Sequence, residues 1–186
     1  MRIVGGRARG THLAGPKSPA IRPTSDRLRE SLFNILAHGL GDPVEGARVL
    51  DLFSGTGALG LEALSRGARF CLFVEEAAEA RALIHTNVEA LGAGGITKLW
   101  RRDATKLGRC APMEPFDLAF LDPPYGKGLA DAALAAMADG GWLKPGAIVV
   151  VEESATAAIT VPLGLVFVDE RQQGDTRLAF LRRTEA

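Results

Sequence analysis

The sequence predicts an α/β fold, in which helices cover both faces of an open and mostly parallel sheet. Over residues 48–152, five short strand-like segments alternate with helical ones, an alternation typical of parallel strands joined by crossover connections. Two more strand-like segments flank Gly174-Asp175, a natural hairpin turn. The closing hairpin should therefore add an antiparallel strand to the sheet. The 186 residues, 47% of them hydrophobic, fit one domain with a small appendage.

The individual elements follow from apolar spacing and from stop signals. In residues 24–40, leucine and isoleucine recur at helical spacing after Thr24 or Ser25, either of which can cap a helix, and Gly39 and Gly41 end the pattern. Further helices are predicted over residues 58–66, 77–91 and 129–137. Strands are predicted over residues 48–53, 69–75, 96–102, 116–121, 147–152, 165–172 and 177–182. The segment between the third and fourth strands leaves little room for a helix.

Positive charge gathers at the start of the chain. The whole chain has 22 basic and 22 acidic side chains, but residues 1–30 hold seven basic and two acidic ones. This excess suggests a polyanionic partner, and a solvated, partly disordered tail is the alternative. We expect residues 1–45 to form a basic arm and helix, and residues 46–186 to form the main domain. A signal peptide and a membrane span are not apparent, so a cytoplasmic protein without membrane contacts is expected.

A glycine-rich loop follows the first predicted strand. Gly55 and Gly57 allow a tight turn and close approach of a ligand, and Glu75 ends the next strand, where it can accept hydrogen bonds from ribose hydroxyls. With Gly60 the loop also matches the dinucleotide fingerprint, which leaves an NAD(P)-dependent oxidoreductase as a distant alternative. Asp51 argues against it, because a carboxylate there would oppose a diphosphate but would suit a cationic methionine group. A turn that only packs helix on strand is the structural alternative.

Other residues near this loop are weaker candidates. Phe53 would line a cofactor pocket or belong to the core. Asp103 follows the third strand and could accept from an adenine amino group, or it could cap a turn. Glu75 and Glu76 are adjacent, and the register of the strand favours Glu75 as the ribose ligand.

The remaining polar residues suggest no second site. Cys71 and Cys110 lack the spacing of metal ligands, so no metal is expected. Glu152 and Glu153 end the fifth strand and are expected to be solvated.

Asp122-Pro123-Pro124-Tyr125 comes directly after the strand over residues 116–121. Two prolines end the strand in a stiff turn at the carboxyl edge of the sheet. The exocyclic amine of a base is a poor nucleophile, and hydrogen bonds to Asp122 and to the Pro123 carbonyl would aim its lone pair at an activated methyl group. Tyr125 could stack on a base taken out of its stack. A turn that merely closes the strand, with Tyr125 as surface packing, is the alternative.

These motifs, with two N-terminal ones, resemble the RsmD family. The N-terminal resemblance lies in residues 5–10, with Gly-Gly and a later Arg-Gly, and in residues 22–36, which read RPTSDRLRESLFNIL. The glycine loop and its helix, residues 51–68, and the turn at residues 122–125 are similar to that family as well. The resemblance covers residues 1–183.

The resemblance implies a Rossmann-like class I methyltransferase with a seven-stranded sheet in the order 3-2-1-4-5-7-6. The family methylates N2 of a guanine in 16S ribosomal RNA, using S-adenosylmethionine. The cofactor residues that it implies are Asp51, Gly55, Gly57, Glu75 and Asp103. Phe53, proposed above from its position, completes the predicted cofactor set. The residues implied for holding the guanine are Asp122, Pro123 and Tyr125, and those near the site or the RNA are Arg22, Thr24 and Arg27.

Other functions make different predictions. An adenine-N6 or cytosine-N4 DNA methyltransferase uses a similar turn, but it usually needs a separate domain to read base edges. Residues 1–45 are too few for such a domain, and their charge suits phosphate contacts on a structured RNA. A protein-amide methyltransferase usually has Asn at the position of Asp122. A non-enzymatic RNA-binding module would not need the cofactor loop. Nothing in the sequence requires more than a monomer.

Overall fold

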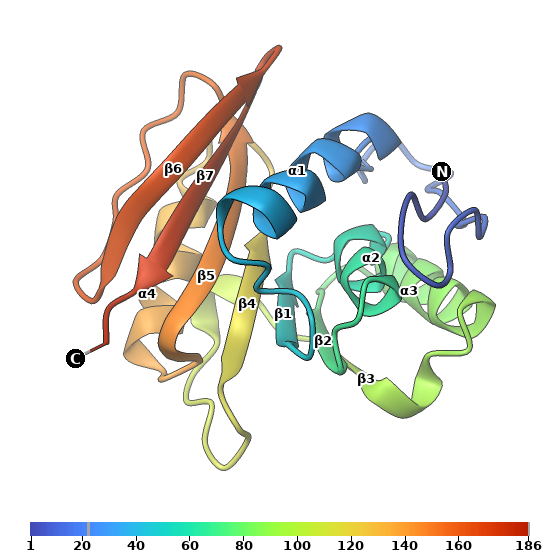
Figure 1. Cartoon of the computed structure of the whole chain (residues 1–186), viewed down its shortest axis with the longest axis horizontal. Helices are drawn as coiled ribbons and strands as arrows, with labels where there is room; N and C mark the ends of the chain where they lie inside the picture. Colours follow the sequence, from blue (N-terminus) through green and yellow to red (C-terminus); the bar gives the residue numbers. More distant parts are fainter. Residues whose placement is uncertain (22, 186) are drawn as a thin grey trace.

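The computed structural model describes residues 1–21 and 23–185. Its helices are α1 (Asp26–Gly39), α2 (Ala58–Ser65), α3 (Ala78–Ala90) and α4 (Leu129–Asp139), with short 3₁₀ turns η1 (Gly94–Ile96) and η2 (Ala104–Lys106) (Figure 1). Its strands are β1 (Arg48–Leu52), β2 (Phe70–Val74), β3 (Thr97–Trp100), β4 (Phe116–Leu121), β5 (Leu143–Ser154), β6 (Leu165–Gln173) and β7 (Thr176–Arg183).

The strands form one seven-stranded sheet in the order β3-β2-β1-β4-β5-β7-β6. The neighbours from β3 to β5 pair in parallel, whereas β7 lies antiparallel between β5 and β6. The predicted fold class and strand order are therefore confirmed. Between β3 and β4 the chain forms only η2, in agreement with the short segment that the sequence leaves there.

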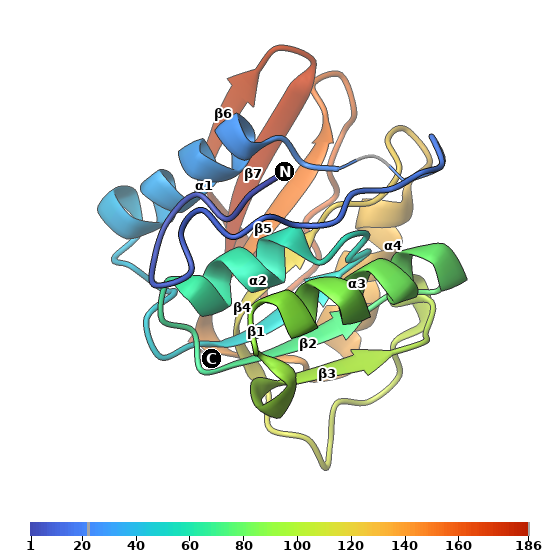
Figure 2. The ribbon, with the colours of Figure 1, turned by 90° about the vertical axis from the view of Figure 1, so that its right-hand side faces the viewer.

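Side-chain alternation along the strands divides the core into two layers. Leu118 and Phe120 of β4 point into a cluster with residues of α1, α2 and α3, whereas Ala119 and Leu121 point into a second cluster with residues of α4. Figure 2 shows α2 and α3 side by side along the sheet. Helices thus cover both faces, as expected for parallel strands joined by crossovers.

The N-terminal arm packs onto the first of these layers. Ile3 and Leu13 are each 1% exposed, within the cluster that α1 and α2 share. A single antiparallel bridge joins Arg2 to His12. Helix α1 starts at an N-cap formed by Ser25, whose hydroxyl accepts from the Leu28 N–H at 3.1 Å. The described part of the arm therefore shares a core with the sheet.

One strand is longer than its pattern predicts. The sequence indicates a fifth strand over residues 147–152, but β5 spans Leu143–Ser154. Pro145 and Gly146 come before the predicted start, yet they lie inside the strand, where the register with β4 shifts between Phe116 and Leu118. Among the described residues, no helix is long and apolar enough to cross a membrane.

Candidate active site

The carboxyl ends of the central strands bring the sequence-predicted site residues to one edge of the sheet. Leu52 of β1 pairs with Val74 of β2 and with Leu121 of β4, and Leu121 pairs with Val151 of β5. The residues that follow these positions therefore meet at one level of the edge: Phe53, Glu75, Asp122 and Glu152. In an open α/β sheet, ligands bind at this edge.

The glycine loop between β1 and α2 has the close backbone that a ligand requires. Gly55 has φ 56° and Gly57 has φ 80°, and Phe53 also adopts a left-handed φ of 55°. Among the described residues outside the immediate chain neighbours, a Cβ at Gly55 would meet Ile21 alone within 4 Å, at 3.8 Å, so space remains beside this backbone. A left-handed Phe costs conformational energy, and such strain is concentrated at functional sites.

Gly60 serves packing. A Cβ at Gly60 would lie 2.5 Å from Phe73 Cε1 and 2.6 Å from Cys71 Sγ. Helix α2 can therefore approach β1 and β2 only because this position has no side chain. The third glycine of the fingerprint thus brings α2 close to the sheet.

Asp51 is a buried acid beneath the loop. It is 1% exposed, and its Oδ2 accepts from the Gly60 N–H at 3.0 Å. Burial, reinforced by the nearby Glu75, raises the pKa of the Asp51 carboxyl well above its ordinary value. Within residues 1–21 and 23–185, no basic side chain forms an ion pair with it. A cationic ligand would compensate this buried charge.

The structure places Glu75, and not Glu76, against the glycine loop. Glu75 Oε1 accepts from the Gly55 N–H at 2.8 Å, and Oε2 accepts from the Ala77 N–H at 3.0 Å. Glu76 is exposed. The carboxylate of Glu75 is thereby fixed at the mouth of the loop.

Asp103 caps η2. Its Oδ1 accepts from both the backbone N–H of Thr105, at 2.9 Å, and the Thr105 hydroxyl, at 2.7 Å. The hydrogen bond from the Thr105 hydroxyl, followed by that from the Thr105 backbone N–H, lowers the pKa of the Asp103 carboxyl. The capping role that the sequence leaves open is therefore present in the structure.

The Asp-Pro-Pro-Tyr turn is held from two sides. Asp122 Oδ2 accepts from the Thr24 hydroxyl at 3.1 Å, which brings the segment before α1 to the turn. The Tyr125 hydroxyl donates to Glu152 Oε2 at 2.9 Å and lies 2.9 Å from Thr176 Oγ1. These contacts fix the orientation of the aromatic ring. Pro123 is buried and Pro124 is exposed.

The prediction that Glu152 and Glu153 are solvated is wrong. Each is 3% exposed, and β7 pairs with β5 to its last residue. Glu153 Oε1 accepts from the Gly126 N–H at 3.1 Å, so both acids hold the turn. Their position beside the double proline, at the end of an uninterrupted buried strand, is the signal that could have indicated this.

The N-terminal candidates differ in position. Thr24 is 7% exposed and contacts Asp122, whereas Arg27 is exposed on the first turn of α1. Arg22 lies outside the described residues. Two buried charges were missed: Arg29 on α1 and Glu62 on α2, which have no exposed surface. Each lies among the buried apolar residues of its helix. A charged residue at such a position is expected to have a buried partner of opposite charge.

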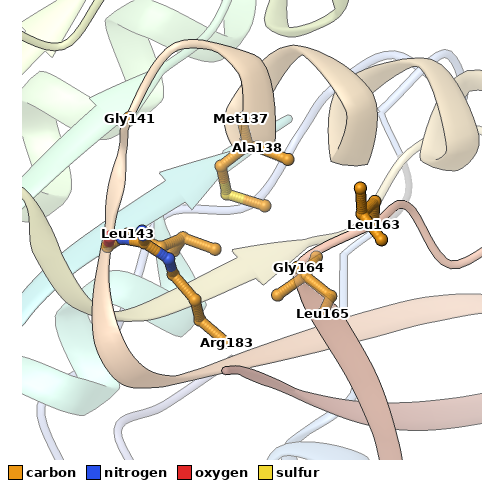
Figure 3. Close-up of a pocket in the computed structure, with 8 residues that line it drawn as sticks. All are labelled: Met137, Ala138, Gly141, Leu143, Leu163, Gly164, Leu165 and Arg183. Carbon is orange, nitrogen blue, oxygen red and sulfur yellow. Dashed lines mark hydrogen bonds between the residues drawn. The ribbon is translucent and has the colours of Figure 1, made fainter. Parts of the chain in front are cut away.

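The pocket in Figure 3 is separate from this edge. It is lined by Met137 and Ala138 of α4, by residues near the starts of β5 and β6, and by the half-buried Arg183, which ends β7. It encloses about 120 Å³. Because Leu143 begins β5 and Glu152 is near its end, the pocket lies at the opposite end of the sheet from the candidate site.

Comparison with known proteins places the chain in a family. The family model described as "Conserved hypothetical protein 95" matches residues 1–182. "Ribosomal RNA small subunit methyltransferase D" of Escherichia coli (strain K12) is 35% identical over 184 residues, which cover 98% of this chain and 90% of that protein.

The chain belongs to this family, the RsmD family. The protein of the same name from Haemophilus influenzae is 32% identical, over 94% of this chain and 89% of its own. A solved structure from Escherichia coli, named "Putative methyltransferase yhhF", superimposes with a TM-score of 0.84 at 32% identity, over 99% of this chain and 98% of that one. The predicted resemblance to the RsmD family is confirmed, and the matched residues include the N-terminal arm.

Proposed function

We propose that this RsmD-family chain transfers a methyl group from S-adenosylmethionine to the exocyclic N2 amine of a guanine in 16S ribosomal RNA. The observation that carries the proposal is the meeting of the glycine loop and the Asp-Pro-Pro-Tyr turn at one edge of the sheet. The names of its relatives, which are small-subunit ribosomal RNA methyltransferases, support the RNA substrate.

The cofactor residues would be those of the glycine loop and its surroundings: Asp51, Phe53, Gly55, Gly57, Glu75 and Asp103. The fit rests on chemistry. Open space beside Gly55 admits a ligand, and the buried Asp51 carboxylate favours one with positive charge. Glu75, bonded to the Gly55 N–H, still has lone pairs for ribose hydroxyls. When bound, S-adenosylmethionine supplies an already activated methyl group.

The turn would prepare the nucleophile. Asp122 and the Pro123 carbonyl accept hydrogen bonds from the N2 amine, which orients the nitrogen lone pair toward the methyl group. Tyr125, its ring fixed by Glu152 and Thr176, stacks on the extruded base. Transfer would move the methyl group from the sulfonium sulfur to N2, with S-adenosylhomocysteine as the leaving group. The methylated amine would then give up a proton, which Asp122 would accept directly or through water. Catalysis then consists of positioning and local electrostatics.

Glu152 supports guanine over adenine or cytosine. In guanine the ring atom beside the target amine is the N1–H donor, whereas adenine N6 and cytosine N4 each lie beside a ring nitrogen that only accepts. Asp122 and Glu152 come directly after two residues, in β4 and β5, that pair with each other. Phe120 and Val150, two positions earlier, belong to the same core cluster, so Asp122 and Glu152 lie on the same face of the sheet. Two carboxylates side by side match two adjacent donors, so Glu152 would accept from N1–H.

The basic arm would bind the RNA backbone. Arg29 is buried, but five other cations are exposed in the described segment: Arg2, Arg7, Arg9, Lys17 and Arg27. We assign residues 1–45, including Arg22 and Thr24, to RNA contact and residues 46–186 to cofactor binding and chemistry. We further propose that the chain acts as a cytoplasmic monomer on a small-subunit or assembly-intermediate substrate.

The test is methyl transfer from labelled S-adenosylmethionine to small ribosomal subunits that lack modifications, followed by nucleoside analysis. We expect N2-methylguanosine with the wild type and its loss with Asp122→Ala, while S-adenosylhomocysteine still binds. Asp139→Ala, an exposed change at the end of α4, is the matched control and should keep full activity. Methyl on adenine N6, on cytosine N4 or only on DNA would overturn the guanine assignment. Binding of NAD instead of S-adenosylhomocysteine would overturn the methyltransferase.

A further inference from the structure

Arg29 is a buried cation that donates hydrogen bonds to four acceptors. Its side chain has no exposed surface, although it stands near the start of α1. Its Nε donates to Glu62 Oε1 at 3.2 Å, and its Nη2 donates to Asp26 Oδ1 at 2.9 Å and to the Arg2 carbonyl. Its Nη1 donates to the Thr24 carbonyl at 3.1 Å. The rigid fork of the guanidinium thus fixes several points at once.

Glu62 on α2 is the fixed end of this network. Its side chain is also fully buried. Besides Arg29, it accepts from Arg66 Nε at 2.8 Å and from the backbone N–H groups of Val4 and Gly5, at 3.0 and 2.9 Å. One carboxylate therefore joins the arm, α1 and α2. Because α2 packs directly on the sheet, this anchor is tied to the strands that bear the site.

The network reaches the candidate active site through Thr24. Arg29 holds the carbonyl of Thr24, and the hydroxyl of Thr24 donates to Asp122 Oδ2 at 3.1 Å. Thr24 is buried, so its place is set by these contacts and by its neighbours in the arm. The backbone position of Thr24 decides whether its hydroxyl can reach Asp122.

We propose that Arg29 is a positioning residue for methyl transfer, which acts through Thr24 on the orientation of Asp122. Glu62 in turn fixes Arg29. A buried ion pair is a weak source of stability, because desolvation offsets much of its attraction, and an apolar replacement often serves the fold as well. A role in positioning Thr24 explains why the Arg29 guanidinium donates to the Thr24 carbonyl. The inference rests on the proposed function of Asp122.

The test compares Arg29→Met, Thr24→Val and the double variant in the same methyl-transfer assay. Small misplacements of a catalytic group can cost about 100-fold in rate, so we expect kcat to fall by about 10- to 100-fold in each single variant. S-adenosylhomocysteine affinity should be unchanged, because the glycine loop is untouched. The double variant should be no slower than the slower single one, since both act on one contact. Thr24→Ser, which keeps the hydroxyl, should retain most of the wild-type kcat.

Arg171→Met, exposed on β6, is the matched control and should leave kcat unchanged. Arg29→Lys keeps a cation opposite Glu62 but lacks the planar guanidinium, and it replaces Arg29→Met in the assay if that variant does not fold.

A wild-type kcat in a folded Arg29 variant, or losses that multiply in the double variant, would overturn the proposal. A crystal structure of Arg29→Lys gives a readout that is independent of activity: the hydroxyl of Thr24 should leave Asp122, and its retention there would refute the inference. An inactive wild type would instead count against the proposed function alone.

Discussion

Asp51→Asn should become more stable relative to the wild type as the pH rises, at the expense of cofactor binding. Burial raises the pKa of the Asp51 carboxyl well above its ordinary value of 3.8. Between those two pKa values the unfolded chain releases a proton that the folded chain keeps. Folding must then take up a proton, so the contribution of Asp51 to stability is complete at low pH and is lost as the pH rises toward the folded-state pKa.

The magnitude follows from one proton. The unfolding free energy of the wild type should fall, relative to that of Asp51→Asn, by about 1.4 kcal/mol for each pH unit between the two pKa values. The amide is nearly isosteric and keeps an acceptor oxygen for the Gly60 N–H, so that hydrogen bond largely cancels in the comparison.

Urea unfolding of both proteins at half-unit steps from pH 4.5 to pH 8 would measure this difference. A difference that stays constant across the range would refute the argument, because it would mean that Asp51 binds no extra proton in the folded state. S-adenosylmethionine added at pH 7 should stabilise the wild type more than the variant if the buried carboxylate compensates the charge of the cofactor.

Three further predictions concern packing, selectivity and RNA. Gly60→Ala should destabilise the fold by about 1–3 kcal/mol in urea unfolding, because its Cβ would press on Phe73, whereas Gly94→Ala, with open space around it, should cost far less. Glu152→Gln should reduce the preference for guanine over adenine in single-stranded RNA oligonucleotides, since an amide can also donate; unchanged selectivity would contradict the role of Glu152. Replacing Arg7 and Arg9 together by Ala should weaken RNA binding in proportion at all sequences and reduce the slope of log affinity against log salt by about 1–2, and an unchanged slope would remove the arm from the interface.

The fold could be predicted from the sequence because its signals are local and agree with one another. β1, β2 and β4 are mainly apolar runs that end at a turn or a polar residue, and the glycine loop and the double proline mark two strand ends at the same edge. β5 was less predictable at its start, since Pro145 and Gly146 are residue types disfavoured inside strands, and here they lie where the register with β4 shifts.

The candidate site was only partly predictable because some of its contacts join distant segments. Asp122 and Glu75 follow from position alone. The burial of Glu152 depends on β7, which arrives from the end of the chain, and the link from Arg29 to Thr24 depends on Glu62, 33 positions beyond Arg29 on another helix. Propensity and spacing describe a residue by its near neighbours, so a buried charge can be noticed there while its partner cannot be identified.

The distribution of charge separates the two ligands that the proposed reaction needs. Asp51, Glu75, Asp122 and Glu152 lie on the face of the sheet that α1 and α2 cover, whereas the exposed cations of the arm lie outside it. A phosphate group would be repelled by these carboxylates, and a cationic cofactor would be attracted. The RNA backbone should therefore remain on the arm, and only a neutral base, with its amine hydrogens directed at acceptors, should enter. The same electrostatics disfavour a dinucleotide at the glycine loop despite its matching glycines, and they require the target base to leave its stack before it can reach Asp122.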